Sequence, residues 1–427
     1  MYLQMLLPRI YFHLEKMQRC SDLESEAVEK ATSLIKIPIT LEIPIGPQHP
    51  AIHEPVLLKV YADGEEVVGV DIGTGYNHRG VEKLLENNTF YKDKFISSRI
   101  CGICNTVHEN CFVRAVEYIS GIEPSARAKY LRVLVMELER IHSHMLINAI
   151  MAEIIGFDTL FMYIMRDREL VMKAKEIVSG GRVLAEFHMF GGVRRDIDDV
   201  KKEKILDILK KLEPRLKYYR RLFEEDPTIA KRLMEIGILK PRDVVSHGML
   251  GPILRGSGVK SDVRAEDKYD VYGEIPFNVI VRGEGDSLAR MLVRWDEALE
   301  SLEMCRYILE HLPSGSAVVD ERKLPRVFPA GESFARVEAP RGELTYYIQH
   351  VGGNKPYRVK VRTPSFNNII NSGFSYLRHS IADVPVILVS YDPCISCMER
   401  AIVVDLKNGT EKKVTLRDIA MGKVRLG

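Results

Sequence analysis

Two cysteine pairs with identical spacing constrain the fold of this chain more than any other feature. Cys101 and Cys104 stand in "RICGIC", Cys394 and Cys397 stand in "DPCISC", and most of the chain separates the two pairs. One C-x-x-C pair fits a redox disulfide, half of a zinc site or chance, whereas two pairs supply the four thiolates that a soft metal prefers. The sequence therefore favours a fold that brings two distant segments together around one shared metal.

The same thiols also fit other kinds of site. A zinc knuckle usually has its second pair within a few tens of residues, so the long separation argues against a self-standing zinc module. Either pair alone could be a redox-active dithiol, and all four thiols could simply be buried as small hydrophobic groups. We interpret the other three cysteines, Cys20, Cys111 and Cys305, as structural, because unpaired cysteines usually pack in cores.

Composition and charge argue against several classes of protein. The chain has 427 residues, of which 46% are hydrophobic and 28% charged, as in a soluble globular protein. Its 61 basic and 59 acidic residues nearly cancel, which gives no support for a nucleic-acid partner or a basic membrane patch. Seven cysteines, an odd and clustered set, differ from a secreted disulfide framework and favour a reducing, cytoplasmic setting.

No stretch of the sequence is apolar enough to predict a transmembrane helix. Such a helix requires roughly 18 apolar residues, and the closest run, which begins at Met145, is interrupted by Asn148 and Glu153. If the protein works at a membrane, we therefore expect a partner to hold it there.

Hydrophobic periodicity predicts an α+β fold with a mostly helical core. Residues 38–72 alternate apolar and polar around an Ala-Asp-Gly turn, which indicates a small β-sheet near the N-terminus. Helical patterns are expected at 131–146, 157–179, 198–224 and 286–312. From about residue 333 the pattern is again typical of strands, and the apolar run "VPVILVS" before Asp392 is predicted to be a buried strand.

The sequence shows no sign of a domain boundary within its central part. No internal repeat or low-complexity linker occurs, so we predict one domain over residues 38–400. An N-terminal extension, residues 1–37, precedes it, and a charged, alternating tail, residues 401–427, follows it. Nothing before Met17 is typical of a targeting segment, and a true start at Met17 is an alternative interpretation of the first residues.

Residues around the cysteines extend the pairs into two longer signatures. The first is R-x-C-G-x-C-x-x-x-H, from Arg99 to His108, and the second is D-P-C-x-x-C-x-x-R, from Asp392 to Arg400. They resemble the two signatures of the large subunit of nickel-iron hydrogenases. The resemblance continues in "GPQHPAIHEP", "GYNHRGVEKLL", "ELERIHSHML", "FGGVRRDI", "GPILRGSGVKSD" and "VEAPRGELTYY". Within this family the chain most resembles the energy-converting, membrane-associated group, whose large subunits also resemble a subunit of respiratory complex I.

This resemblance implies the hydrogenase large-subunit fold and a role for each paired cysteine. Cys101 and Cys394 would be terminal nickel ligands, and Cys104 and Cys397 would bridge nickel to an iron that carries CO and cyanide. Thiolates are soft, electron-rich donors that suit a metal with changing redox state. The complex I relatives lack the four thiols and bind no nickel, so their presence favours a metal-bearing enzyme.

Three further residues acquire catalytic roles from the resemblance. Glu54, in "HPAIHEP", matches the glutamate that takes the proton from a terminal thiolate, and a buried carboxyl there would have a raised pKa. Arg341, in "EAPRGE", matches an arginine that lies over the metal pair. Asp392 would orient that arginine or the neighbouring thiolate. Without the resemblance, Glu54 and Arg341 would be interpreted as surface residues.

The histidines are not expected to bind the metal. His108 is either an ordinary helix histidine or a contact with the site or a partner subunit, and we expect His142 and His144 in a polar network or at an interface. Many family members end the second signature with a histidine, after which a protease removes the tail. Here the residue is Arg400, so either the tail is retained or the chain is an immature form.

The resemblance thus predicts the catalytic subunit of a nickel-iron hydrogenase that reduces protons to dihydrogen or runs in reverse. Electrons would come from an iron-sulfur small subunit, since the chain has too few spare cysteines for a cluster. A membrane arm that pumps ions would be a further partner, which places the chain peripherally on the cytoplasmic side. The alternatives are a nickel-free redox subunit of a complex I-like assembly that acts on a quinone or sulfur compound, and a structural zinc protein.

Overall fold

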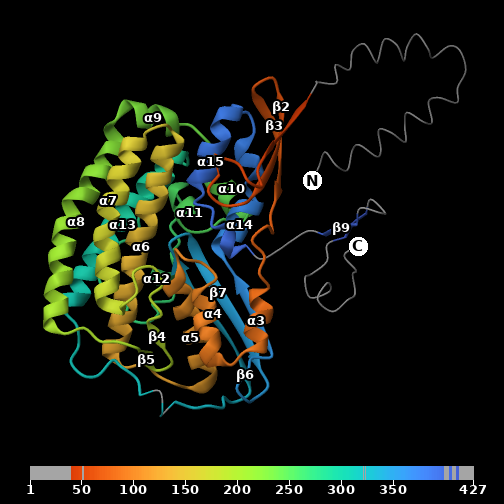
Figure 1. Cartoon of the computed structure of the whole chain (residues 1–427). Helices are drawn as coiled ribbons and strands as arrows, with labels where there is room; N and C mark the ends of the chain where they lie inside the picture. The colour runs from red at the N-terminus through yellow and green to blue at the C-terminus, as the bar shows by residue number, and fades with distance from the viewer. Residues whose placement is uncertain are drawn as a thin grey trace, which may run out of the picture. The chain divides into compact units, whose positions relative to one another are not determined.

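Four long helices form the core of the computed structural model, which describes residues 40–50, 52–320, 322, 324–398, 403–405 and 410–412. The four are α6 (Ala126–Ile154), α7 (Asp158–Ser179), α8 (Asp199–Glu225) and α13 (Ser287–Glu310). Helix α6 packs against α7 and α13, and α8 packs against α7 and α13 (Figure 1). All four helices predicted from the periodicity of the sequence are confirmed.

Side chains that precede these helices set where they begin. The Ser125 hydroxyl accepts a hydrogen bond from Ala128 N at 3.2 Å at the start of α6. The Asp198 and Asp286 carboxylates do the same at the starts of α8 and α13, at 2.8 Å each. Such caps satisfy backbone N–H groups that have no partner within a helix. Helix α6 is buried along most of its length, so it holds its polar side chains inside the core.

Two small three-stranded sheets lie in the parts of the sequence where strands were predicted. The first has the order β1-β2-β3, with strands Leu41–Ile45, Leu57–Asp63 and Glu66–Gly73. The second has the order β6-β7-β8, with strands Gly331–Ala339, Gly342–His350 and Arg358–Arg362. Helix α5 (Asn105–Ser120) packs against β6 and β7, and α3 (Val81–Asn87) packs against β8. The structure confirms the predicted α+β class with a mostly helical core.

Shorter elements connect the bundle to the sheets. They are α4 (Phe90–Ser98), β4 (His188–Met189), β5 (Gly192–Val193), α9 (Pro227–Leu233), α10 (Pro241–Ser246), α11 (Pro252–Gly256), α12 (Val263–Glu266), α14 (Pro364–Ile370) and α15 (Val384–Ser390). Single 3-10 turns span Ser372–Tyr376, Ile381–Asp383 and Ile395–Cys397.

The predicted strand at "VPVILVS" is wrong, because these residues form helix α15. The Ser380 and Asp383 side chains make a reciprocal capping box that starts a 3-10 turn, and Pro385 lies in the first turn of the helix that follows. A short, wholly apolar run carries no periodicity that separates a buried helix from a buried strand. Helix α15 packs against α6 and α13, which explains why six of its seven residues are apolar.

By its contacts the chain divides into two units, Met1–Leu41 and Glu42–Gly427, and the bundle and the β6-β7-β8 sheet belong to the second. The predicted extension 1–37, with Met17 and Cys20, lies outside the described residues, as does Arg400. Of the tail, only the antiparallel strands β9 (Val403–Asp405) and β10 (Thr410–Lys412) are described. The predicted domain limits therefore stay a prediction.

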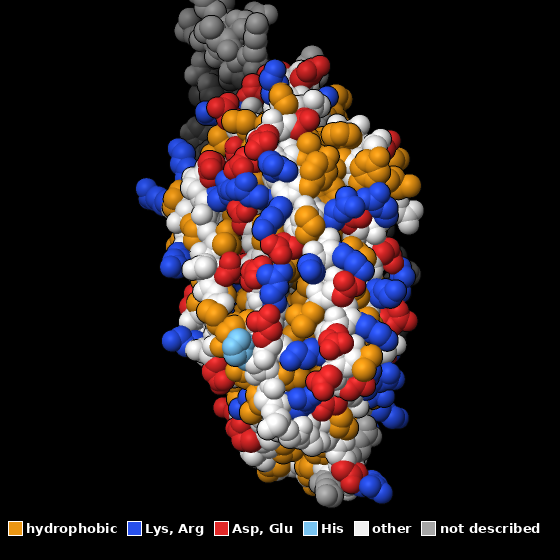
Figure 2. Space-filling view, turned by 90° about the vertical axis from the view of Figure 1, so that its left-hand side faces the viewer, with side chains coloured by type: hydrophobic (Ala, Val, Ile, Leu, Met, Phe, Trp, Pro, Cys, Tyr) orange, Lys and Arg blue, Asp and Glu red, His pale blue; other side chains and the backbone are white. Residues whose placement is uncertain are grey.

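The surface on the side of α8 carries basic and acidic side chains mixed together, without a large patch of one charge (Figure 2). This mixture agrees with the near balance of charges in the whole sequence. Among the helices of the described residues, none has the length and apolar character needed to cross a bilayer.

Candidate metal centre

The two cysteine pairs meet in the interior of the fold. The four sulfur atoms of Cys101, Cys104, Cys394 and Cys397 all lie within 4.8 Å of one another, and all four residues are buried. The Cys101 and Cys394 sulfurs are 3.2 Å apart, those of Cys394 and Cys397 3.1 Å, and those of Cys104 and Cys397 3.8 Å. None of the four forms a disulfide. The fold thus brings the predicted ligands together as free thiols.

This donor set fits a soft metal. Four sulfur atoms form the group, with no carboxylate or imidazole among them, and thiolates select metals such as nickel or zinc over calcium or magnesium. Hydrogen bonds from the other three thiols hold the pKa of Cys101 well below its usual range, and the pKa of each of the other three is raised.

The buried carboxylate of Glu139 fixes the backbone that follows the first cysteine pair. Helix α5 begins directly after Cys104, and its N–H groups at Thr106 and Val107 donate to the Glu139 carboxylate of α6 at 2.9 and 3.1 Å. The Lys175 ammonium of α7 lies 3.3 Å from the same carboxylate. Because Glu139 caps the helix, the side chain of Cys104 is not needed as a cap and is available to the cluster.

A second carboxylate, that of Glu54, holds the second pair in a similar way. One of its oxygens, Oε2, accepts hydrogen bonds from the backbone N–H groups of Ile395 and Ser396, the latter at 3.0 Å. Burial raises the pKa of Glu54, and the charge of Cys101 raises it further. The hydrogen bonds and Arg341 oppose this shift without cancelling it. Glu54 thus lies beside the cluster with a pKa shifted in the direction that favours its protonated form.

The Arg79 side chain connects the backbones of the two cysteine pairs, a role that we did not predict from the sequence. Its guanidinium donates to the carbonyl oxygens of Arg99 at 3.1 Å and Ile100 at 2.6 Å, just before the first pair. It also donates to the carbonyl oxygen of Ser396, inside the second pair, at 2.9 Å. A guanidinium can bond several acceptors in a fixed fork. The only signal in the sequence was the place of Arg79 in "GYNHRG", one of the segments that carry the resemblance.

Arg341 and Asp392 form a buried ion pair beside the thiols. The guanidinium donates to the Asp392 carboxylate at 2.6 Å, to the Asp392 carbonyl oxygen at 3.0 Å and to the Ser143 hydroxyl at 3.2 Å. Burial alone would lower the pKa of Arg341, but Asp392 and the thiolates hold it well above its ordinary value. Asp392 has a φ of 56°, in the left-handed region that few residue types other than glycine adopt readily. Arg341 is therefore a fixed cation at this site.

His108 contacts the site, while a contact with a partner subunit stays a prediction. Its Nε2 atom lies 3.6 Å from the Cys397 sulfur, and its Nδ1 atom lies 2.8 Å from the Tyr346 hydroxyl. Burial lowers the pKa of His108 to about 4, so the ring is neutral at pH 7.

The remaining predicted polar residues and cysteines lie elsewhere in the core. His144 bonds Glu297 at 2.9 Å, and His142 accepts a hydrogen bond from Arg168 at 2.8 Å, so both belong to polar networks as expected. Cys111 and Cys305 are buried outside the cluster, in agreement with a structural role.

Comparison with known proteins gives matches over most of the chain. The family model described as "Respiratory-chain NADH dehydrogenase, 49 Kd subunit" matches residues 155–327 and 325–400, and "Nickel-dependent hydrogenase" matches residues 79–148. The "Carbon monoxide-induced hydrogenase" of Rhodospirillum rubrum is 40% identical over 84% of this chain and 99% of that protein. The "Membrane-bound hydrogenase subunit alpha" of Pyrococcus furiosus is 37% identical over 90% and 92%.

Other relatives are not named as hydrogenases. One subunit of the F(420)H(2) dehydrogenase of Methanosarcina mazei is 37% identical over 83% of this chain and 96% of that protein. A chain of the archaeal membrane-bound sulfane sulfur reductase, a respiratory membrane complex, superposes with a TM-score of 0.80 at 35% identity, over 84% of this chain and 98% of that one. The chain therefore belongs to the family that unites the 49 kDa-type subunits of complex I-like dehydrogenases with the large subunits of nickel-dependent hydrogenases.

Proposed function

We propose that this chain is the catalytic large subunit of an energy-converting nickel-iron hydrogenase, which reduces protons to dihydrogen or catalyses the reverse reaction. The observation that carries the proposal is the convergence of four free thiols within 4.8 Å. Similarity to two relatives named as hydrogenases supports it. Cys101, Cys104, Cys394 and Cys397 would hold the nickel-iron centre, whose iron would carry CO and cyanide.

The roles of the surrounding side chains follow from their positions. A nickel-iron pair held by these sulfurs would supply the electron-pair acceptor that heterolytic cleavage of dihydrogen requires. Glu54, whose pKa is raised by burial, would take the proton from a cysteine sulfur and pass it outward. Arg341, fixed by Asp392, would place a permanent positive charge where negative charge develops. The neutral ring of His108 would hold the Cys397 sulfur in place.

Partners of this subunit would supply electrons and the link to the membrane. We propose an iron-sulfur small subunit as electron donor and an ion-pumping membrane arm beyond it, with the chain peripheral on the cytoplasmic side. Similarity to subunits named as parts of membrane-bound and respiratory complexes supports this arrangement.

A nickel-free redox subunit that acts on a quinone or a sulfur compound is the second candidate. Relatives named as NADH-quinone oxidoreductase subunits and the similar chain of the sulfane sulfur reductase favour it. The two candidates differ in what the four thiols hold, so the metal decides between them.

The test is the metal content of the protein, purified anaerobically together with its partner subunits. We expect about one nickel per chain, because four thiolates suit a soft metal, and infrared bands of CO and cyanide in the same sample. Zinc, or no metal and no such bands in a fully assembled complex, would contradict the proposal and favour the nickel-free subunit.

Glu54→Gln should separate proton transfer from metal binding. Glutamine keeps a carbonyl oxygen for the N–H groups of Ile395 and Ser396 but carries no transferable proton, so nickel content should stay unchanged. Loss of a positioned proton carrier lowers rates by about 10²–10⁴-fold, and we expect a fall in hydrogen evolution of this order. Glu123→Gln, at a side chain that is 82% exposed, is the matched control and should leave the rate unchanged. Full activity in the Glu54 variant would remove this residue from the mechanism.

A further inference from the structure

His142 is a buried histidine of helix α6 with one ring nitrogen that has no partner among the described residues. The residue is 1% exposed. Its Nδ1 atom lies 2.8 Å from the Arg168 guanidinium, whereas its Nε2 atom is buried and makes no hydrogen bond within the part of the chain that the structure describes. Buried polar atoms are nearly always paired, so an unpaired one requires an explanation.

The contact with Arg168 determines which ring nitrogen of His142 carries the hydrogen. A guanidinium can only donate hydrogen bonds, so Nδ1 is the acceptor and carries no hydrogen. Burial, together with the charges of Lys175, Arg168 and Arg341, lowers the pKa of His142 well below its usual range, which keeps the ring neutral. In a neutral ring without hydrogen on Nδ1, the hydrogen is on Nε2. His142 is therefore a buried Nε2–H donor without an acceptor.

Helix α6 places this donor beside the thiol cluster. Ser143, the residue that follows His142, accepts a hydrogen bond from Arg341 at 3.2 Å. The charge of Cys101 raises the pKa of His142 and that of Arg341 lowers it, and such effects fall off with distance. No hydrogen bond joins Nε2 to any of the four clustered thiols, all of which are described. The ring thus lies close to the cluster without bonding its sulfur atoms.

The side chains around the ring offer its N–H group no acceptor. Arg168, Arg341 and Lys175, whose charges act on His142, carry only donors. The Glu139 carboxylate, one helical turn earlier on the same face of α6, is engaged by backbone N–H groups and by the Lys175 ammonium at 3.3 Å. Within the described ranges, the acceptor is therefore not a side chain of the fold.

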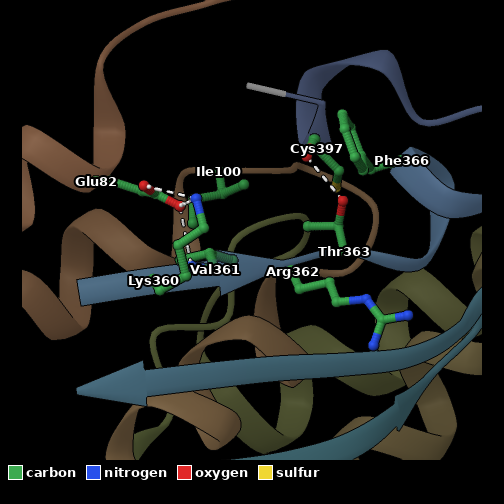
Figure 3. Close-up of a pocket in the computed structure, with 8 residues that line it drawn as sticks. All are labelled: Glu82, Ile100, Lys360, Val361, Arg362, Thr363, Phe366 and Cys397. Carbon is green, nitrogen blue, oxygen red and sulfur yellow. Dashed lines mark hydrogen bonds and ion pairs between the residues drawn. The ribbon is translucent and has the colours of Figure 1, made fainter. Parts of the chain in front are cut away.

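The pocket beside the second cysteine pair does not provide the acceptor either. Its lining consists of residues 360–363, Glu82, Ile100, Phe366 and Cys397 (Figure 3). His142 is not among these residues, so a water molecule in the pocket does not meet the Nε2–H group. A group bound at the thiols is the remaining acceptor.

We propose that the Nε2–H group of His142 donates a hydrogen bond to a non-protein ligand of the metal centre that the four thiols hold. This inference rests on the proposed function, under which the iron carries CO and cyanide. Cyanide brings a negative charge and a nitrogen lone pair, which makes it the better acceptor of the two. Arg168 also donates to the His142 carbonyl oxygen at 3.1 Å, so one guanidinium holds both the backbone and the ring in place.

The position of the ring hydrogen is tested in the full-length chain purified without nickel. In protein with ¹⁵N-labelled histidine, the nuclear magnetic resonance signals of each ring show which nitrogen carries hydrogen. Loss of one set of signals in His142→Gln identifies those of His142. We expect the Nε2–H form at pH 7, because Nδ1 accepts from Arg168. A ring with hydrogen on Nδ1, alone or together with Nε2, would overturn the proposal.

Infrared spectra of the complex, purified anaerobically with its partner subunits, test the hydrogen bond itself. His142→Phe keeps a planar ring but removes the donor, so the cyanide bands should shift. His142→Gln keeps an N–H donor at the end of its side chain, so its cyanide bands should stay close to those of the unmodified protein. His350→Phe is the control and should shift no band, because this buried histidine at the end of β7 packs on Phe90, with ring centroids 4.9 Å apart.

The spectra also separate this proposal from the proposed function. Cyanide bands that do not move in His142→Phe would contradict only the role of His142, since the bands themselves show that the centre is present. Equal shifts in the Phe and Gln variants would indicate altered packing and would also overturn this role. A fully assembled complex without nickel and without such bands would contradict the proposed function, and with it the ligand to which His142 is proposed to donate.

Discussion

Cys394→Ser is expected to abolish nickel binding and to lower hydrogen evolution to background. The Cys394 sulfur lies 3.2 Å from that of Cys101 and 3.1 Å from that of Cys397, so it is in the middle of the donor set. A serine hydroxyl is a hard, neutral donor at pH 7, and a site for a soft metal loses one of its four ligands. Nickel per chain and the rate of hydrogen evolution should therefore fall together.

Cys305→Ser is the matched control for this change. Cys305 is equally buried, but its sulfur contacts the Leu134 carbonyl oxygen instead of the cluster. This contact, 3.9 Å long, is too long for a serine hydroxyl, so the variant should lose about 1–3 kcal/mol of stability, but the four clustered thiols are unchanged and the nickel content should be retained. If the Cys394 variant kept both nickel and activity, the four-thiol centre would not be the catalytic site.

Arg341→Leu is expected to lower the free energy of unfolding by about 3–5 kcal/mol, because removal of one partner of a buried ion pair leaves an uncompensated charge. The Asp392 carboxylate is 1% exposed, and among the described residues it would keep only Arg294, 3.8 Å away, as a nearby cation. Urea unfolding of the full chain measures the change.

A second substitution shows whether the unpaired charge of Asp392 causes the loss of stability. Asp392→Asn, added to Arg341→Leu, removes the buried charge, and asparagine tolerates the left-handed φ of 56°. The double variant should therefore be more stable than the single one. Arg322→Leu, at an 89% exposed side chain paired with Asp320, is the control, and exposed pairs contribute only about 0–1 kcal/mol. A double variant no more stable than Arg341→Leu alone would show that lost packing, and not charge, is the cause.

The fold could be predicted where a long segment has a clear period. Helices α6 and α13 are long enough for the apolar stripe to repeat several times, and the strands β6 and β7 are nine residues long each. The prediction failed at helix α15 because its run of six apolar residues before Ser390 fits a buried strand and a buried helix equally well. Its identity depends on the capping residues Ser380 and Asp383, which are short-range signals outside the run.

The candidate site could be predicted only where residue type itself carries information. Paired cysteines are rare enough to point to a metal, whereas Glu54 and Arg341 were found through the resemblance and not through any pattern. Arg79 and Glu139 were not assigned a role, because they act through backbone groups of the cysteine segments. A side chain that bonds the backbone of a distant segment leaves no periodicity or spacing in the sequence.

The position of the two pairs also bears on how the protein is made. Cys101 and Cys104 come from the first third of the chain and Cys394 and Cys397 from its last tenth. Because synthesis proceeds from the N-terminus, a growing chain on the ribosome carries half of the cluster until translation is almost complete. A metal held by all four thiols, as proposed, can therefore be bound only after synthesis is almost complete.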